Sequence, residues 1–205
     1  MAGGVVLEPF TSADFGRLIT WIPDAEFLMQ WGGPVFHWPL DERQLELYLA
    51  GAEGPAAERA VFRARLSNGA SAETGQDSGG PTDPRADAEP ADHVVGHVEL
   101  NHLDPENGTA TLSRVLIGPP AQRGRGHGAS MVEAAVEFGF GGIGLHRIDL
   151  GVFDFNQAAI RCYERVGFRR EGLLRDSRRV GDTYWDLVVM ALFDDDWRAS
   201  REEKR

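Results

Sequence analysis

A glycine- and arginine-rich stretch lies in the middle of the chain, Ala121-Gln122-Arg123-Gly124-Arg125-Gly126-His127-Gly128. It follows a predicted strand over 110–117 and opens a predicted helix over 127–140. Its glycines let the backbone approach a ligand, and the free amides and positive dipole end of the helix favour an anion. The dipole alone contributes about 0.3–1 kcal/mol, so tight binding of a pyrophosphate also needs charge-assisted hydrogen bonds from Arg123 or Arg125. We therefore predict a phosphate-binding loop here.

The same loop has a second interpretation, as a dinucleotide-binding turn. Gly124-x-Gly126-x-x-Ala129 fits the pattern G-x-G-x-x-G/A, and Asp149 follows as a candidate ribose partner. Two arginines inside the loop are unusual for that motif, and a doubly wound fold needs more βα units than the chain offers before the loop. Binding of NAD is the observation that would favour this alternative.

The pattern on both sides of the loop predicts a mixed α/β domain, in which antiparallel strands feed a β-α-β unit. We expect one domain over 1–205. Residues 67–92 are rich in Ser, Gly, Ala, Pro and Asp with almost no large apolar side chain, so they are predicted to form a flexible insertion in a hairpin. The predicted strands are 5–7, 61–66, 93–100, 110–117, 145–152 and 183–192, the last paired with 168–175, and the predicted helices are 15–22, 24–31, 42–49, 127–140 and 156–166.

Composition excludes several classes of protein. The net charge of −11 argues against general nucleic-acid binding, although the arginines in 114–125 and 161–179 could form a local basic patch. No apolar run has the ~18 residues of a membrane helix, and the first residues do not have the features of a signal peptide. The single cysteine, Cys162, rules out an internal disulfide framework and suits a reducing cytoplasm. No Cys/His cluster has zinc spacing, so we expect no metal.

Three motifs in the second half of the chain together identify a family. They are Arg123-x-x-Gly126-x-Gly128, the stretch 145–152 (Leu-His-Arg-Ile-Asp-Leu-Gly-Val), and the run from Asn156 to Gly172 with its Tyr-Glu-x-x-Gly-Phe. With them the chain resembles the Gcn5-related N-acetyltransferase (GNAT) superfamily, and most of all its ribosomal-protein-alanine acetyltransferase branch. The resemblance covers about 94–192. Many relatives have Ser where this chain has Ala159, a departure that concerns one minor coenzyme contact.

The resemblance implies a mostly antiparallel, twisted sheet with a V-shaped splay between two central strands and with helices on both faces. It also implies that acetyl-CoA binds with its pantetheine arm in the splay, along strand Ser113–Ile117, and that the acetyl group passes directly to an amine in a ternary complex. The coenzyme-binding residues implied are Val115, Leu116, Ile117, Arg123, Gly124, Arg125, Gly126, His127, Gly128, Asn156 and Tyr163.

The proton transfers of such a reaction direct attention to two further places. A lysine-type amine has a reference pKa near 10.4, so recruiting its neutral form at pH 7 costs roughly 4–5 kcal/mol. Tyr163 is the candidate acid for the departing sulfur, because it lies two helical turns after Asn156, which can bond the pantetheine arm. A Tyr163 that only packs on the sheet, and an Asn156 that only caps its helix, are the plainer alternatives.

The candidate base lies on the predicted strand 93–100. Val94, Gly96, Val98 and Leu100 share one face of that strand, so Glu99 and His97 lie on the other, which we expect to face away from the core. Glu99 is the preferred base, directly or through a water, and His97 the substitute. Ordinary solvated side chains are the alternative for both. Cys162 has no base beside it, so a covalent cysteine mechanism is rejected.

The predicted function is transfer of an acetyl group from acetyl-CoA to a primary amine, with a small cationic amine or a protein N-terminus as acceptor. The predicted alternative of another class is a non-catalytic acyl-CoA sensor on the same fold, which would keep the loop but tolerate loss of Tyr163. A homodimer is compatible with either. An aromatic-rich region is expected either to line the acceptor pocket or to pack in the core: Trp21, Phe27, Trp31, Phe36 and Trp38.

Overall fold

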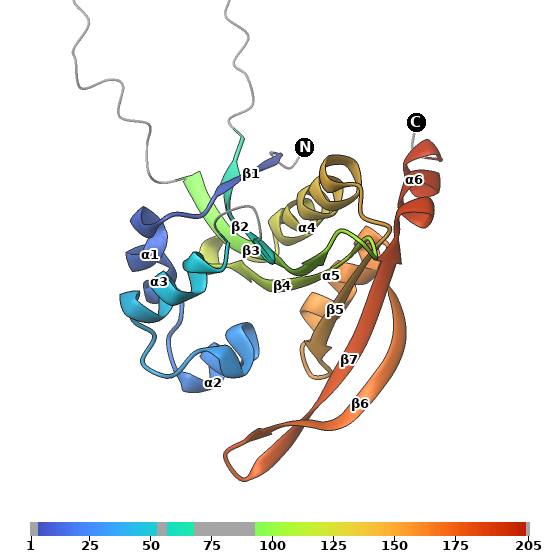
Figure 1. Cartoon of the computed structure of the whole chain (residues 1–205). Helices are drawn as coiled ribbons and strands as arrows, with labels where there is room; N and C mark the ends of the chain where they lie inside the picture. Colours follow the sequence, from blue (N-terminus) through green and yellow to red (C-terminus); the bar gives the residue numbers. More distant parts are fainter. Residues whose placement is uncertain (1–3, 53–56, 68–92, 204–205) are drawn as a thin grey trace, which may run out of the picture.

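The molecule is built on one seven-stranded sheet with the order β1-β2-β3-β4-β5-β7-β6 (Figure 1). The computed structural model describes residues 4–52, 57–67 and 93–203. All neighbouring strands are antiparallel except β4 and β5, which are parallel and joined through helix α4. The strands are β1 (Val5–Pro9), β2 (Arg59–Leu66), β3 (Val94–Asp104), β4 (Thr109–Ile117), β5 (Arg147–Phe153), β6 (Arg169–Val180) and β7 (Thr183–Phe193).

The two parallel strands separate along most of their length. Only Thr109, Ala110 and Thr111 of β4 are in register with β5, at 147–149. Beyond Thr111, β4 continues to Ile117 and β5 to Phe153 without pairing between them in the described part of the chain. The expected V-shaped splay is therefore confirmed, and it leaves one backbone edge of β4 without a neighbouring strand.

Helices cover both faces of the sheet, as expected (Figure 1). Helices α1 to α3 lie on one side, and α4 on the other. Two of the helices on the first side begin at a capping aspartate: the Asp41 carboxylate accepts from the Gln44 amide at 2.9 Å before α3, and the Asp24 carboxylate accepts from the Phe27 amide before α2. The α-helices are α1 (Phe15–Thr20), α2 (Ala25–Gly32), α3 (Glu42–Ala50), α4 (His127–Glu137), α5 (Gln157–Val166) and α6 (Asp194–Glu202).

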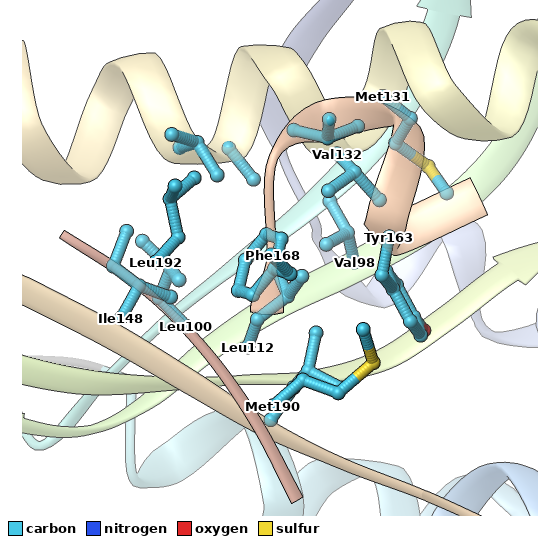
Figure 2. Close-up of a cluster of buried hydrophobic side chains, with 14 of the residues drawn as sticks. Val98, Leu100, Leu112, Met131, Val132, Ile148, Tyr163, Phe168, Met190 and Leu192 are labelled. Atoms are coloured by element: carbon cyan, nitrogen blue, oxygen red, sulfur yellow. The ribbon is translucent and has the colours of Figure 1, made fainter. Parts of the chain in front are cut away.

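Two hydrophobic cores share the sheet. The first lies between the sheet and helices α4 and α5, where Val98 and Leu100 of β3 meet Met131 and Val132 of α4 (Figure 2). The second lies on the opposite face under α1, α2 and α3; its buried members include Trp31, Leu45 and Tyr48. Successive residues of β3 therefore point into different cores, and over 94–100 neither face of this central strand is open to solvent.

Two features of the fold depart from the sequence-based expectations. The helix predicted over 127–140 ends at Glu137 and continues as a π-helical segment, Phe138–Ile143. Helix α6 was not expected, because its sequence is polar around most of its circumference; Trp197 nonetheless packs against Phe140 at a ring distance of 5.6 Å. The flexible insertion predicted for 67–92 lies, from residue 68 on, outside the described residues, so it stays a prediction, as does the single-domain organisation.

Candidate active site

A cavity of about 540 Å³ opens where β4 and β5 have separated. Its size is typical of a small-molecule site. Three arginines line it, and none of the described lining residues is acidic, so its walls favour an anionic ligand. It is lined by Phe27, Gln30 and Trp31 of α2, by Val115, Leu116 and Ile117 of β4, by Gln122, Arg123, Gly124, Gly126, Gly128 and Ala129, and by Asn156, Ala158, Ala159, Arg161, Cys162, Tyr163 and Arg165 of the α5 region.

The free edge of β4 forms one wall of this cavity. Val115, Leu116 and Ile117 line it, as the resemblance implied. Because β5 has moved away at this point, backbone amides and carbonyls on that edge form no ladder with it. Buried backbone groups need hydrogen-bond partners, so an extended, polar ligand arm can take the place of the missing strand.

The glycine loop lies at one end of the cavity. Gly124 and Gly126 have φ of 74° and 90°, in the left-handed region that only glycine adopts without strain, and Gly126 is the residue from which α4 starts. No heavy atom lies within 4 Å of the position that a side chain would take at either glycine. The first turn of α4 thus presents its free amides toward an open space, the arrangement that binds phosphate groups.

Arg123 anchors this loop to the end of β4. Its Nε donates to the Ile117 carbonyl at 2.9 Å and its guanidinium donates to the Gly118 carbonyl at 3.0 Å. The same group lies 5.8 Å from the centre of the Phe27 ring on α2. From the glycine loop, Arg123 therefore contacts both the end of β4 and helix α2. Its side chain is exposed at the edge of the cavity.

Two members of the predicted coenzyme-binding set do not line the cavity. Arg125 is exposed outside it, and the side chain of His127 is buried at the start of α4, where Nδ1 has no hydrogen-bond partner in the described part of the chain. The loop contributes through Arg123, Gly124, Gly126 and Gly128 instead.

Helix α5 brings Asn156 and Tyr163 to the same wall. The Asn156 side-chain oxygen accepts from the Ala159 amide at 3.2 Å, so it caps the helix, and the residue also lines the cavity. Tyr163 is 8% exposed and lines it too. Burial, with a smaller contribution from Cys162, raises the pKa of the Tyr163 hydroxyl, which therefore carries its proton at neutral pH. Asn156 and Tyr163 therefore line the same cavity, and the roles assigned to them stay predictions.

Cys162 also lines the cavity, but its chemistry is unfavourable for a nucleophile. Burial is the main cause that raises the pKa of its thiol above the ordinary value. A thiol is reactive as thiolate, and a raised pKa removes that form at neutral pH. The rejection of a covalent cysteine mechanism agrees with this environment.

The expectation that Glu99 and His97 face away from the core is wrong. Both side chains are buried, in the second core under α1 to α3, and neither lines the cavity. Glu99 accepts hydrogen bonds from the Arg114 guanidinium and, at 2.6 Å, from the Tyr48 hydroxyl. Arg59 lies 3.8 Å from its other oxygen. These contacts hold Glu99 in a buried polar cluster. Helices α1 to α3 cover the strand face that the alternation pattern had assigned to solvent.

His97 is held in the same cluster. Burial lowers its pKa from 6.5 to about 4, more strongly than its hydrogen bond to the Arg114 backbone and the nearby Glu99 raise it. Its Nδ1 lies 3.1 Å from the Arg114 carbonyl oxygen. Because a carbonyl oxygen only accepts, Nδ1 carries the hydrogen and the ring is neutral at pH 7.

Other lining residues had been left open or missed by the sequence-based predictions. Phe27 and Trp31 had been expected either at the acceptor pocket or in the core; both line the cavity, and Trp31 lies in the second core while Phe27 packs against it. Arg161 and Arg165 are four residues apart on α5, so they lie on one face of that helix and line the cavity mouth. The concentration of arginines in 161–179 was the available signal, but it did not say which of them share a face with Asn156.

The chain belongs to the Acetyltransferase (GNAT) family, whose profile matches residues 55–168, more than half of the chain. The fold agrees with that family: the chain superposes on a spermidine N-acetyltransferase from Vibrio cholerae in complex with CoA and spermine with a TM-score of 0.73. That alignment has 17% identity and covers 95% of this chain and 98% of the other. The predicted superfamily and fold class are thus confirmed.

Individual relatives are N-acetyltransferases by name. The chain is 32% identical over 108 residues to the probable N-acetyltransferase YjcK of Bacillus subtilis, which covers 51% of this chain and 58% of the relative. It is 30% identical over 98 residues to the spermidine N(1)-acetyltransferase of Vibrio cholerae, covering 48% of this chain and 56% of the relative. The chain spans about half the length of the curated relatives it matches.

The described residues contain neither a membrane-spanning helix nor a group of metal-binding side chains. No helix in 4–52, 57–67 or 93–203 is long and apolar enough to cross a membrane. Over the same ranges, no group of three or more His, Cys, Asp or Glu side chains is arranged to hold a metal ion.

Proposed function

We propose that this protein is an N-acetyltransferase that moves an acetyl group from acetyl-CoA to a primary amine within a ternary complex. One observation carries the proposal: the free edge of β4, the glycine loop at the start of α4, and the side chains of Asn156 and Tyr163 all meet at one cavity. A dinucleotide site would not need an unpaired strand edge. The retained Tyr163, buried and protonated, favours an enzyme over a sensor.

The coenzyme is proposed to lie along β4 with its phosphates toward the arginines. The pantetheine arm carries two amide groups, which can pair with the backbone of Val115 and Ile117. The pyrophosphate would be held by the free amides at the start of α4 and by nearby guanidinium groups. Arg123, Arg161 and Arg165 all line the same cavity, so they are the candidates for these charge-assisted bonds.

The chemical step is proposed to be a direct attack. The neutral amine nitrogen attacks the thioester carbonyl carbon, the C–N bond forms, the C–S bond breaks, and the sulfur receives a proton from the Tyr163 hydroxyl. A proton lost by the amine passes to solvent, and solvent returns one to Tyr163. No described residue lining the cavity is a carboxylate, and Glu99 is engaged by Arg114. We therefore propose that the acceptor loses its first proton to solvent rather than to Glu99 or His97.

The acceptor is proposed to be a small molecule with a primary amine. One of the named relatives and the superposed structure are spermidine N-acetyltransferases, and the net charge of −11 attracts a cation to the molecule as a whole. The arginines at the cavity are assigned to the phosphates of the coenzyme, so their charge does not distinguish a monoamine from a polyamine. A protein N-terminus, as in the ribosomal-protein-alanine branch, stays a prediction, as do the cytoplasmic location, the homodimer and the absence of nucleic-acid partners.

Calorimetric titration tests the coenzyme. Wild-type protein is expected to bind acetyl-CoA and not NAD. Gly126→Val should abolish binding, because a β-branched residue at φ 90° disrupts the loop. Gly181→Val is the matched control, since Gly181 also has positive φ (59°) but lies in the β6–β7 turn away from the cavity. Wild-type protein that binds NAD in place of acetyl-CoA would overturn the proposal.

Release of the CoA thiol over a panel of amines tests the reaction. With an accepted amine, Tyr163→Phe is expected to lower kcat about 10²-fold, the lower end of the effect of a positioned proton donor, with the acetyl-CoA Kd nearly unchanged. Phe168→Leu is the control: Phe168 packs against the Tyr163 ring at 6.0 Å without lining the cavity. Equal kcat for Tyr163→Phe and wild type would remove Tyr163 from the mechanism.

A further inference from the structure

Strand β4 contains an irregularity at the point where it enters the cavity wall. Along β3, His97 is in register with Leu116 and Glu99 with Ser113, so β4 has one more residue than β3 between these pairs. Within the additional stretch, Arg114 has φ of 51°, a left-handed conformation that is unfavourable for a side chain of this size. Such a bulge bends the strand and re-aims the residues that follow it. Here those residues are Val115 to Ile117.

Two side chains hold the backbone of the bulge. The Arg114 carbonyl oxygen accepts from the Trp31 indole Nε1 at 2.9 Å and from His97 Nδ1 at 3.1 Å. A carbonyl within a regular ladder would bond to the neighbouring strand, whereas this one bonds to a ring on α2 and a ring on β3. Trp31 and His97 also pack edge to face, with ring centres 5.4 Å apart.

The Arg114 side chain is fixed as well. Its guanidinium donates to Glu99 and lies 5.2 Å from the centre of the Tyr48 ring and 5.5 Å from that of Phe36. The residue is only 9% exposed. Both the backbone and the side chain of the left-handed residue are thus held from the α1–α3 side of the sheet, opposite to α4.

We propose that His97 is a positioning residue: with Trp31 it holds the Arg114 carbonyl, keeps the bulge in place, and so sets the direction of the backbone at 115–117 that faces the coenzyme. The proposal rests on the proposed function for the identity of the ligand. The hydrogen bond from His97 contributes a free energy comparable to the cost of the left-handed backbone conformation at Arg114. Loss of this hydrogen bond therefore shifts the equilibrium from the bulged strand toward a regular one. His97 is better suited than Trp31 to a test, because Trp31 lines the cavity itself and His97 does not.

The experiment compares His97→Leu with His97→Asn by calorimetric titration of acetyl-CoA. The Asn amide nitrogen is at the same distance along the side chain as Nδ1 and can donate to the same carbonyl, whereas Leu cannot. We expect His97→Leu to raise the Kd for acetyl-CoA about fivefold, as for the loss of one hydrogen bond, and His97→Asn to stay within about twofold of wild type. Leu28→Val is the control for a loosened core, since Leu28 is buried on α2 in the same core but is not a lining residue.

The possible results separate this inference from the function on which it rests. Wild-type protein without affinity for acetyl-CoA would refute the proposed function. Wild-type binding with unchanged affinity in His97→Leu would overturn the positioning role. Equal weakening in His97→Leu and His97→Asn would also overturn it, because the ring volume and not the donated hydrogen would then matter. Weakening in His97→Leu that Leu28→Val reproduces at a similar loss of thermal stability would reduce His97 to a packing residue.

Discussion

The arginine of the bulge in β4, Arg114, and the two arginines of α5 that line the cavity, Arg161 and Arg165, have different surroundings. Arg114 is buried among aromatic rings, and its charge is met by the Glu99 carboxylate. Arg161 and Arg165 are exposed at the cavity, where no described lining residue carries a negative charge. A buried arginine that is paired with a carboxylate is engaged within the protein. Arginines that line a cavity without a nearby carboxylate remain able to bind an anionic ligand. The position of the acidic partner, and not the number of arginines, distinguishes the structural group from the ligand-binding one.

The largest effect is expected where the buried pair is broken. Glu99→Ala leaves the Arg114 charge without its carboxylate in a buried site, and we expect the free energy of unfolding to fall by about 3–5 kcal/mol. Urea denaturation followed by circular dichroism measures it. The double variant Glu99→Ala, Arg114→Met is expected to regain part of the loss, since it removes the unpaired charge. A double variant no more stable than Glu99→Ala would show that the pair is not the source of the effect.

The next effect is a pH dependence of stability that comes from His97. Its pKa is about 4 when folded and 6.5 in the reference state, so between these values the unfolded chain binds more protons than the folded one. Stability is then complete above about pH 6.5 and is lost progressively as pH falls toward 4. The loss approaches about 3 kcal/mol, from 1.36 kcal/mol for each pKa unit.

Denaturation at a series of pH values tests this dependence. In His97→Asn the slope between pH 6.5 and 4.5 should be smaller than in wild type, because Asn does not titrate. His37→Asn is the control, since His37 is exposed and lies outside the cluster. Identical slopes in wild type and His97→Asn would contradict the assignment.

The two groups of residues also show what the sequence could predict. The loop with Arg123 and Gly126, the cap at Asn156 and the two-turn spacing to Tyr163 depend on local geometry, and the structure brings them together as expected. Glu99 and His97 were assigned to an open face by the alternation of a single strand. Alternation tells which residues share a face but not what covers it, and the cover comes from helices far away in the sequence. The bulge at Arg114 depends on the same long-range contacts.

The smallest effect concerns the exposed arginines. Arg165→Ala is expected to raise the Kd for CoA about fivefold at low ionic strength, the order of 1 kcal/mol for one solvent-exposed charge contact, and by less at high salt because exposed charges are screened. Arg178→Ala, on the β6–β7 hairpin outside the cavity, is the control and should bind as wild type does at both salt concentrations. If Arg165→Ala matches Arg178→Ala in calorimetric titrations, Arg165 does not hold the coenzyme. Binding would then depend on the loop amides, Arg123 and Arg161, and the contrast with the buried pair would rest on these two cavity arginines.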